Sequence, residues 1–245
     1  MLWQKNPLTV VGHLAQCWLF TYRTNAATAR RLLPEPMEPV LFGGHAYWNV
    51  VVSQIAAMRP LGFPAFVGIG YWHVAYRLYA RFRPATGAPI EGLYFLRSDC
   101  DSAPMTLAGN VMTDFNFHTA GVSVRERAGA HYLRIASPDA PAQAVWHAGA
   151  PTALPAGSPF ASLAEAAAQL KYKPNGLSIT PDGTVNVVPI TRDEAAWRAR
   201  LVTVEVARWA FFDRHEAHPE ICYAVEPIAY RWNRARLYRP QPAQD

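Results

Sequence analysis

Two histidines in predicted strands, His73 and His118, are the side chains of this sequence best suited to acid–base chemistry. An unperturbed imidazole titrates at about pH 6.5, so it can accept or donate a proton near neutrality. Arg77 and Arg97 lie on the same and on the next predicted strand, and a guanidinium group can hold a carboxylate or enolate through two hydrogen bonds. This combination predicts acid–base chemistry on a small molecule that carries a carboxylate or an enolate, with His73 as general acid or base. The alternative for each histidine is a structural role.

In the predicted strand that carries His73, the polarity of the side chains alternates from one residue to the next. Its even positions are all apolar, whereas its odd positions are mostly polar or aromatic: Tyr71, His73, Arg77, Tyr79 and Arg81. Residues two apart share one face of a strand, so one face should pack on a core and the other should meet water or a wet cavity. The pattern alone does not decide whether the odd face meets bulk water or a wet cavity.

Other chemistry-bearing patterns are weak. The sequence has no G-x-S-x-G, Walker, G-x-G-x-x-G or H-E-x-x-H motif, and the two histidines of His215-Glu216-Ala217-His218 are poorly spaced for zinc. Cys17, Cys100 and Cys222 are odd in number and far apart, which predicts neither a disulfide framework nor a thiolate zinc site. We therefore predict no metal site and no cofactor.

The elements that must position these residues are mostly strands. Period-2 patterns predict strands near residues 16–23, 45–54, 70–81, 91–98, 116–126, 177–180, 184–190, 199–211 and 221–232. Three short helices are predicted: after Thr24 or Asn25, after Ser102, and after Ser162, where Glu165 completes a capping box. Because the βαβ alternation of parallel sheets is absent, we predict a mainly β (α+β) fold, either a large antiparallel barrel or a sandwich.

Composition limits the classes of protein and partner. With 245 residues, 51% of them apolar and 17% charged, the chain suits a single folded domain over residues 1–245. The net charge is +5, and the densest basic stretch is residues 231–239. It belongs to a tail rich in arginine, proline and glutamine, which favours a solvated tail over nucleic-acid binding. Apolar runs are too short for a membrane span or a secretory signal. We predict no membrane association and a cytoplasmic protein.

Two segments carry a resemblance to a known family. Residues 22–39, YRTNAATARRLLPEPMEP, and residues 107–121, LAGNVMTDFNFHTAG, resemble the acetoacetate-decarboxylase-like superfamily. The strings HAYWNVVV, MRPLGFP, YWHVAYRLY and GLYFLRSDCDS resemble an uncharacterised domain family within it. The resemblance covers about residues 12–235 and implies a large antiparallel β-barrel with about three short helices and an enclosed lumen. Superfamily members often associate, so it also implies a homo-oligomer as one alternative.

The resemblance also implies what this chain lacks. Decarboxylases of the superfamily form a Schiff base between a lysine and a β-keto acid, with the amine kept neutral by burial and a neighbouring cation. Their Pro-Lys-Lys triplet aligns with residues 116–118, which places Phe117 at the position of the nucleophile. Two lumen glutamates align with Asn49 and His73. Since phenylalanine has no nucleophilic atom, Schiff-base decarboxylation is not expected.

A pocket should take the place of that machinery. We assign catalytic roles to His73, Arg97 and Asn49, and substrate-binding roles to Tyr47, Tyr71, Arg77, Phe117 and His118. The predicted partner is a small keto acid or other carbonyl compound, transformed by lyase-like or isomerase-like chemistry. The alternative is a non-catalytic barrel that binds a small hydrophobic or aromatic ligand, which the eight tryptophans would suit.

Overall fold

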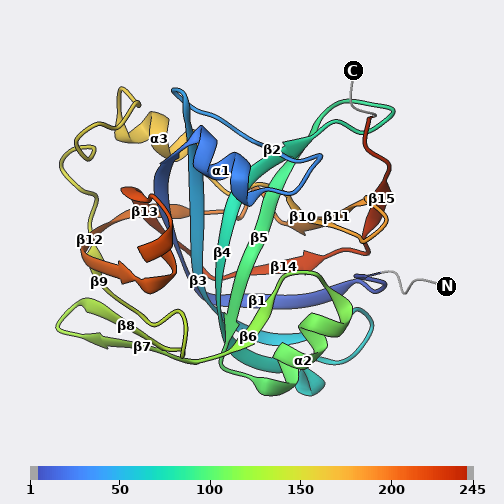
Figure 1. The fold of residues 1–245 in the computed structure, drawn as a ribbon. Helices are drawn as coiled ribbons and strands as arrows, with labels where there is room; N and C mark the ends of the chain where they lie inside the picture. Colours follow the sequence, from blue (N-terminus) through green and yellow to red (C-terminus); the bar gives the residue numbers. More distant parts are fainter. Residues whose placement is uncertain (1–4, 242–245) are drawn as a thin grey trace.

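The computed structural model describes residues 5–241, and its fifteen strands join in one strongly curved sheet (Figure 1). Residues 1–4 and 242–245 of the predicted domain lie outside the described residues. In chain order the strands are β1 (Val10–Asn25), β2 (Glu38–Pro39), β3 (His45–Pro60), β4 (Ile69–Phe82), β5 (Ile90–Cys100), β6 (Phe117–Thr119), β7 (Gly121–Arg127), β8 (Ala130–Ala136), β9 (Ala142–Ala148), β10 (Asn175–Ile179), β11 (Val185–Arg192), β12 (Ala199–Trp209), β13 (His218–Val225), β14 (Ile228–Trp232) and β15 (Arg236–Tyr238).

Three α-helices begin where the sequence predicts them. Helix α1 (Ala26–Leu32) is capped by Asn25, whose Oδ1 accepts a hydrogen bond of 2.7 Å from the Thr28 amide. Helix α2 (Ala103–Met112) is capped by Ser102, and α3 (Leu163–Gln169) by Ser162, whose Oγ accepts from the Glu165 amide at 3.1 Å. The 3-10 helices η1 (Ala65–Val67) and η2 (Ala210–Arg214) are shorter still. Among the described residues, no helix has the length and apolar character needed to span a membrane.

Seven strands close into a ring because the long strand β1 pairs twice. Its first half pairs with β14, from Val10 opposite Trp232 to Leu14 opposite Ile228, and its second half pairs with β13. The ring then runs through β3, β4, β5, β10 and β11 back to β14. All of these pairings are antiparallel except that of β10 with β5. The predicted fold class, a mainly β protein with an antiparallel barrel and three short helices, is confirmed.

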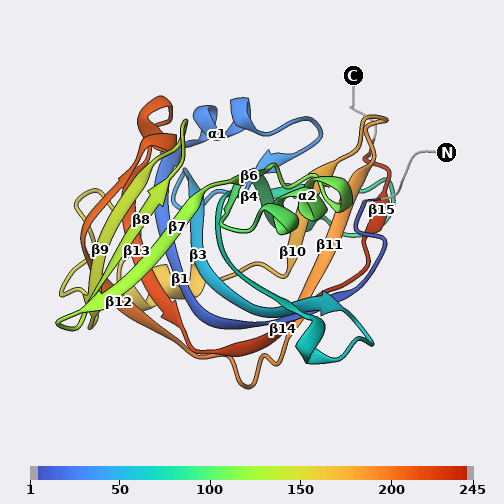
Figure 2. The same cartoon turned by 90° about the horizontal axis from the view of Figure 1, so that it is seen from below.

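A second group of strands extends the ring on one side. Strands β13, β12, β9, β8 and β7 follow β1 in order, and Figure 2 shows them curling away from β10 and β11. Both faces of β4 are consequently buried. Its even residues, from Val74 to Ala80, pack in the core between the ring and these added strands, whereas its odd residues face the interior of the ring.

The tryptophans divide between these two regions. Trp18, Trp48, Trp146 and Trp209 belong to the core beneath the added strands, where Trp146 makes edge contacts with Trp18 at 4.9 Å and Phe20 at 5.3 Å between ring centroids. Of the tryptophans within residues 5–241, only Trp197 and Trp232 line the cavity inside the ring. Most of the described tryptophans therefore fill the core, and two remain available to a ligand.

Candidate ligand-binding site

An inner cavity of about 60 Å³ lies within the ring. Its walls come from six of the seven ring strands, all except β10, and from the loops that follow α3 and β11. The lining residues are Leu14, Cys17, Leu19, Val51, Ser53, Ile55, His73, Arg77, Phe95, Tyr172, Ile190, Arg192, Trp197, Tyr230 and Trp232. This wall is largely apolar but contains two guanidinium groups and an imidazole, and no carboxylate.

Arg77 is a buried cation without an acidic partner. Only 4% of the residue is exposed, and no ion pair between described residues includes it. Its Nη2 donates to Asn49 Oδ1, its guanidinium lies 5.4 Å from the centroid of the Phe95 ring, and its Nε has no partner. Burial lowers the pKa of Arg77 because the charged form is poorly solvated. A negatively charged ligand would compensate this charge.

Asn49 holds Arg77 in place from the neighbouring strand. It lies opposite Arg77 in the pairing of β3 with β4, and its Nδ2 donates to the Tyr79 hydroxyl at 3.1 Å. Tyr79 in turn donates to the Leu170 carbonyl at 2.5 Å, and Tyr223 donates to the same oxygen at 2.7 Å. These bonds tie the end of α3 to the ring and fix the amide orientation of Asn49. Asn49 itself is fully buried and does not line the cavity.

Arg192 is the second guanidinium group of the inner cavity. It stacks on Tyr172 and Trp197, at 4.0 and 3.4 Å from the two ring centroids, and 7% of its side chain is exposed. Its carboxylate partner is Glu194, with an Nε to Oε1 distance of 3.0 Å. Glu194 points outward, since 70% of its side chain is exposed.

His73 lies between the inner cavity and a second, outer cavity. Both cavities share Ile55, His73, Tyr230 and Trp232 as wall residues. Its Nε2 has no partner, and its ring stacks on Phe117 with a centroid distance of 5.3 Å and an interplanar angle of 15°. Burial, with a smaller effect from Arg77, lowers the pKa of His73 to about 3. In the empty site His73 is therefore a neutral imidazole at pH 7.

This low pKa makes folding stability depend on pH. Between pH 6.5 and 3 the unfolded chain binds a proton at His73 that the folded protein does not, so stability is full above 6.5 and declines as the pH falls. Lowering the pH from 7.5 to 5.0 should cost wild type about 2 kcal/mol more than His73→Gln, as measured by urea unfolding. His118→Gln, at an exposed histidine, should behave as wild type. Equal losses in wild type and His73→Gln would contradict a buried neutral imidazole.

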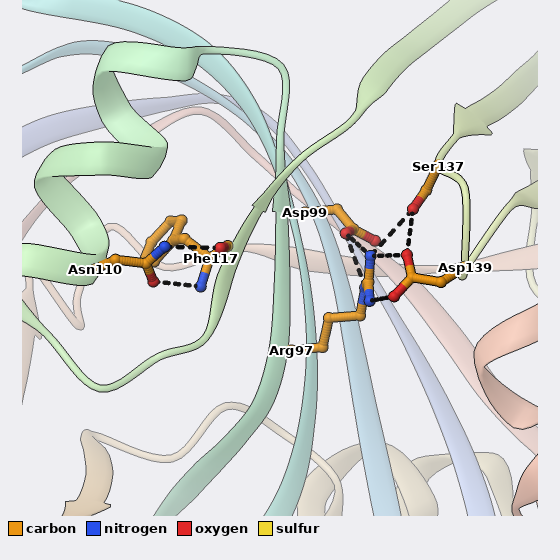
Figure 3. A network of polar contacts seen from close by, with 6 residues as sticks. All are labelled: Arg97, Asp99, Asn110, Phe117, Ser137 and Asp139. Carbon is orange, nitrogen blue, oxygen red and sulfur yellow. Dashed lines mark hydrogen bonds and ion pairs between the residues drawn. The ribbon is translucent and has the colours of Figure 1, made fainter.

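The outer cavity, of about 110 Å³, is lined mainly by apolar side chains from β1, β3, β14 and α2, together with Phe117 and the β4 residues Tyr71 and His73. Phe117 follows α2 and is anchored by Asn110, which accepts from its amide and donates to its carbonyl, each at 2.8 Å (Figure 3). Gly109 makes room for its ring, because a Cβ at that position would lie 2.5 Å from Phe117 Cδ2. Position 117 thus presents an inert ring to the interior.

Arg97 does not join this group. Residue Phe95 lies opposite Arg77, but Arg97 lies opposite Tyr76, so a bulge at Leu96 turns Arg97 to the other face of the sheet. There it binds Asp99 at 2.8 Å and both oxygens of Asp139 at 2.8 and 2.9 Å, turned away from Phe117 in Figure 3. The expected convergence of Arg97 with His73 and Asn49 is therefore not seen.

The other predicted site residues do not all lie at one cavity. Tyr71 lines the outer cavity beside His73, at 6.4 Å between ring centroids. Tyr47 is buried against Phe42 and Phe160, outside both cavities, and burial raises its pKa. His118 is exposed and lies opposite Asp99 in the pairing of β6 with β5. Of the eight predicted residues, His73, Arg77, Tyr71 and Phe117 line a cavity, and Asn49 supports Arg77.

A family model covers most of this chain. The model of DUF2071, described as an uncharacterized conserved protein, matches residues 13–216. The chain belongs to the DUF2071 family. A comparison with curated proteins gave no match.

Solved structures show which fold this DUF2071 protein adopts. An acetoacetate decarboxylase-like enzyme from Sphingomonas wittichii RW1 matches with a TM-score of 0.59 and 14% identity, over 96% of this chain and 94% of that one. The enduracididine biosynthesis enzyme MppR, in complex with pyruvate, matches with a TM-score of 0.60 and 13% identity, over 97% of this chain and 91% of that one. Acetoacetate decarboxylase from Legionella pneumophila matches with a TM-score of 0.60 and 11% identity, over 99% of this chain and 93% of that one. At these identities the likeness establishes the fold alone.

None of the three lysines of this DUF2071 protein lines the inner or the outer cavity of the described structure. Lys5 donates to the carbonyls of Asn110 and Val111 at the end of α2, at 2.9 and 3.1 Å. Lys173 pairs with Glu91 at 2.7 Å, and Lys171 is exposed.

Sequence reasoning missed several residues of the inner cavity in this DUF2071 protein. They are Cys17, Tyr172, Arg192, Trp197, Tyr230 and Trp232. Arg192 is one of twenty arginines, and Tyr172 and Trp197 lie in loops, so no local pattern marks them. Burial raises the pKa of Cys17 to about 12, so its thiol is protonated and not a nucleophile at neutral pH.

Proposed function

We propose that this protein binds a small keto acid in the inner cavity and transfers a proton at His73 without forming a Schiff base. The observation that carries the proposal is Arg77, a buried guanidinium with no carboxylate partner among the described residues. Burying an uncompensated charge costs several kcal/mol, roughly, unless a counter-charge is supplied. A ligand carboxylate on the free Nε edge of Arg77 would supply it.

His73 would act as the acid–base group. Its Nε2 is unpartnered and lies at the wall of the cavity that holds Arg77. A bound carboxylate would neutralise the nearby positive charge and favour the protonated imidazole, which raises the pKa of His73 from its value in the empty site. Asn49 is then a positioning residue, since it contacts Arg77 and not the cavity.

Two observations support the ligand class and the absence of a Schiff base. MppR, which shares the fold, has been solved with pyruvate bound. No lysine lines either cavity within residues 5–241, and Phe117 presents a ring with no nucleophilic atom. A keto acid would therefore be activated by hydrogen bonds and proton transfer.

Binding and chemistry can be tested with one pair of ligands. Calorimetry should detect binding of pyruvate and much weaker binding of methyl pyruvate, which keeps the skeleton but lacks the charge. In D₂O the protein should exchange the methyl protons of pyruvate, as followed by NMR, and His73→Gln should bind pyruvate without exchange. Borohydride should leave the mass of the protein unchanged.

Each other result has a definite meaning. A mass increase after borohydride would show a Schiff base and refute that part of the proposal. Binding without exchange in wild type would refute the role of His73. Tighter binding of methyl pyruvate than of pyruvate would favour the second candidate function, a non-catalytic protein that binds hydrophobic ligands. The apolar wall of the outer cavity supports this second candidate.

A further inference from the structure

The inner cavity contains two arginines, and the proposed function uses only one of them. Arg77 projects from β4 and Arg192 from the end of β11. Tyr172 and Trp197 hold the Arg192 guanidinium between two rings, at 4.0 and 3.4 Å from the ring centroids. A guanidinium in contact with aromatic rings still presents hydrogen-bond donors along its edge. Arg192 is therefore preorganised as a second anion-binding group at the same cavity.

The two cations have little compensation. Arg77 has no carboxylate partner among residues 5–241. Arg192 has Glu194, which contacts it at 3.0 and 3.5 Å from a loop position with 70% of its side chain exposed. Because the Glu194 carboxylate is exposed to water, it can leave the buried Arg192 guanidinium and stay solvated when an incoming carboxylate replaces it. Both arginines also act on the same buried groups, since each lowers the pKa of Cys17 and of Tyr172 against the effect of burial.

We propose that the preferred ligand of the inner cavity is a short dicarboxylate, with one carboxylate on Arg77 and the other on Arg192 in place of Glu194. This inference rests on the proposed binding of an acid at Arg77. The wall contributed by Leu14, Phe95, Ile190 and Trp232 is apolar and suits a short carbon segment between two charged ends. A ligand with a single carboxylate would leave one guanidinium unused.

The test compares succinate with butyrate, which has the same number of carbon atoms and one carboxylate fewer. In calorimetry at low ionic strength, wild type should bind succinate at least about tenfold more tightly than butyrate. Arg192→Gln should abolish this preference and leave butyrate binding within about threefold of wild type. Arg200→Gln, a control at a side chain with 76% exposure, should bind both acids as wild type does.

A second variant keeps Arg192 and its stacking intact. Glu194→Gln removes the internal competitor, so it should strengthen succinate binding several-fold and leave butyrate unaffected. Equal affinity for the two acids in wild type, or no gain in Glu194→Gln, would overturn the dicarboxylate inference while the site at Arg77 stands. Failure of both acids to bind, where pyruvate does bind, would overturn the dicarboxylate inference alone. Failure of pyruvate to bind as well would overturn the proposed function and the inference with it.

Discussion

Replacing Arg97 by methionine should lower the free energy of unfolding by about 3–5 kcal/mol, because it leaves the Asp99 carboxylate buried without a cation. Asp99 is fully buried, and its Oδ1 depends on Arg97 at 2.8 Å. Burial already raises the pKa of Asp99, against the opposing effect of Arg97. Without Arg97 the folded state would hold a proton at Asp99 more tightly, so stability should recover as the pH falls. Urea unfolding at two pH values measures both effects.

Three variants separate this pairing from other causes. Arg97→Met/Asp99→Leu should recover part of the loss, since neither charge then remains buried. Asp139→Asn should cost less than about 1 kcal/mol, because 62% of that side chain is exposed. Pyruvate affinity of folded Arg97→Met should equal that of wild type. If Arg97→Met keeps normal stability but loses ligand binding, the catalytic role predicted for Arg97 from sequence is favoured instead.

Replacing Arg77 by methionine should have the opposite effect on stability. The variant loses the hydrogen bond to Asn49, which costs about 1.5–3 kcal/mol, but it relieves the burial of an uncompensated charge, which costs several. The second effect is larger, so we expect the free energy of unfolding of the empty protein to rise by about 1–2 kcal/mol. Pyruvate binding should weaken by at least about 30-fold. A substitution that raises the free energy of unfolding and weakens ligand binding is typical of a residue that serves binding and not of one that stabilises the fold.

A matched control lies on the same strand. Arg81→Gln changes a side chain that is 45% exposed and 3.6 Å from Glu38, so stability should change by less than about 0.5 kcal/mol and binding should not change. Urea unfolding and calorimetry on the three proteins make the comparison. If Arg77→Met unfolds more easily than wild type and still binds pyruvate, Arg77 is a structural residue and the proposed site is wrong.

Local patterns predicted most of the fold for identifiable reasons. Long strands of alternating character, such as β3 and β4, and side-chain caps such as Asn25 and Ser162 are encoded within a few residues. Strands β8 and β9 were not predicted, although their burial alternates. In β9 the buried positions include Ala142 and Ala144, and alanine carries little strand signal. The hairpin before β8 turns through Ala128 and Gly129, both with positive φ, where alanine is an unusual residue.

The candidate site was predictable only in part. The alternation in β4 grouped Tyr71, His73 and Arg77 on one face, and the structure shows that this face meets the cavities. Arg97 was assigned to the same pocket from the next predicted strand, but one extra residue, Leu96, reverses the direction of the side chains that follow it. A bulge of this kind depends on pairing with β4 and leaves no signal in β5 alone.

By itself, the sequence determined the periodicity of the strands, the starts of the helices and the face of β4 that bears His73 and Arg77, because each depends on neighbours in the chain. Only the tertiary structure decided that Arg77 has no carboxylate beside it, while Arg97 has two. It also brought Arg192 to the cavity of Arg77, through closure of the ring from β11 to β14 and β1. Charge compensation and cavity walls depend on residues distant in the chain, and only the folded ring places them together.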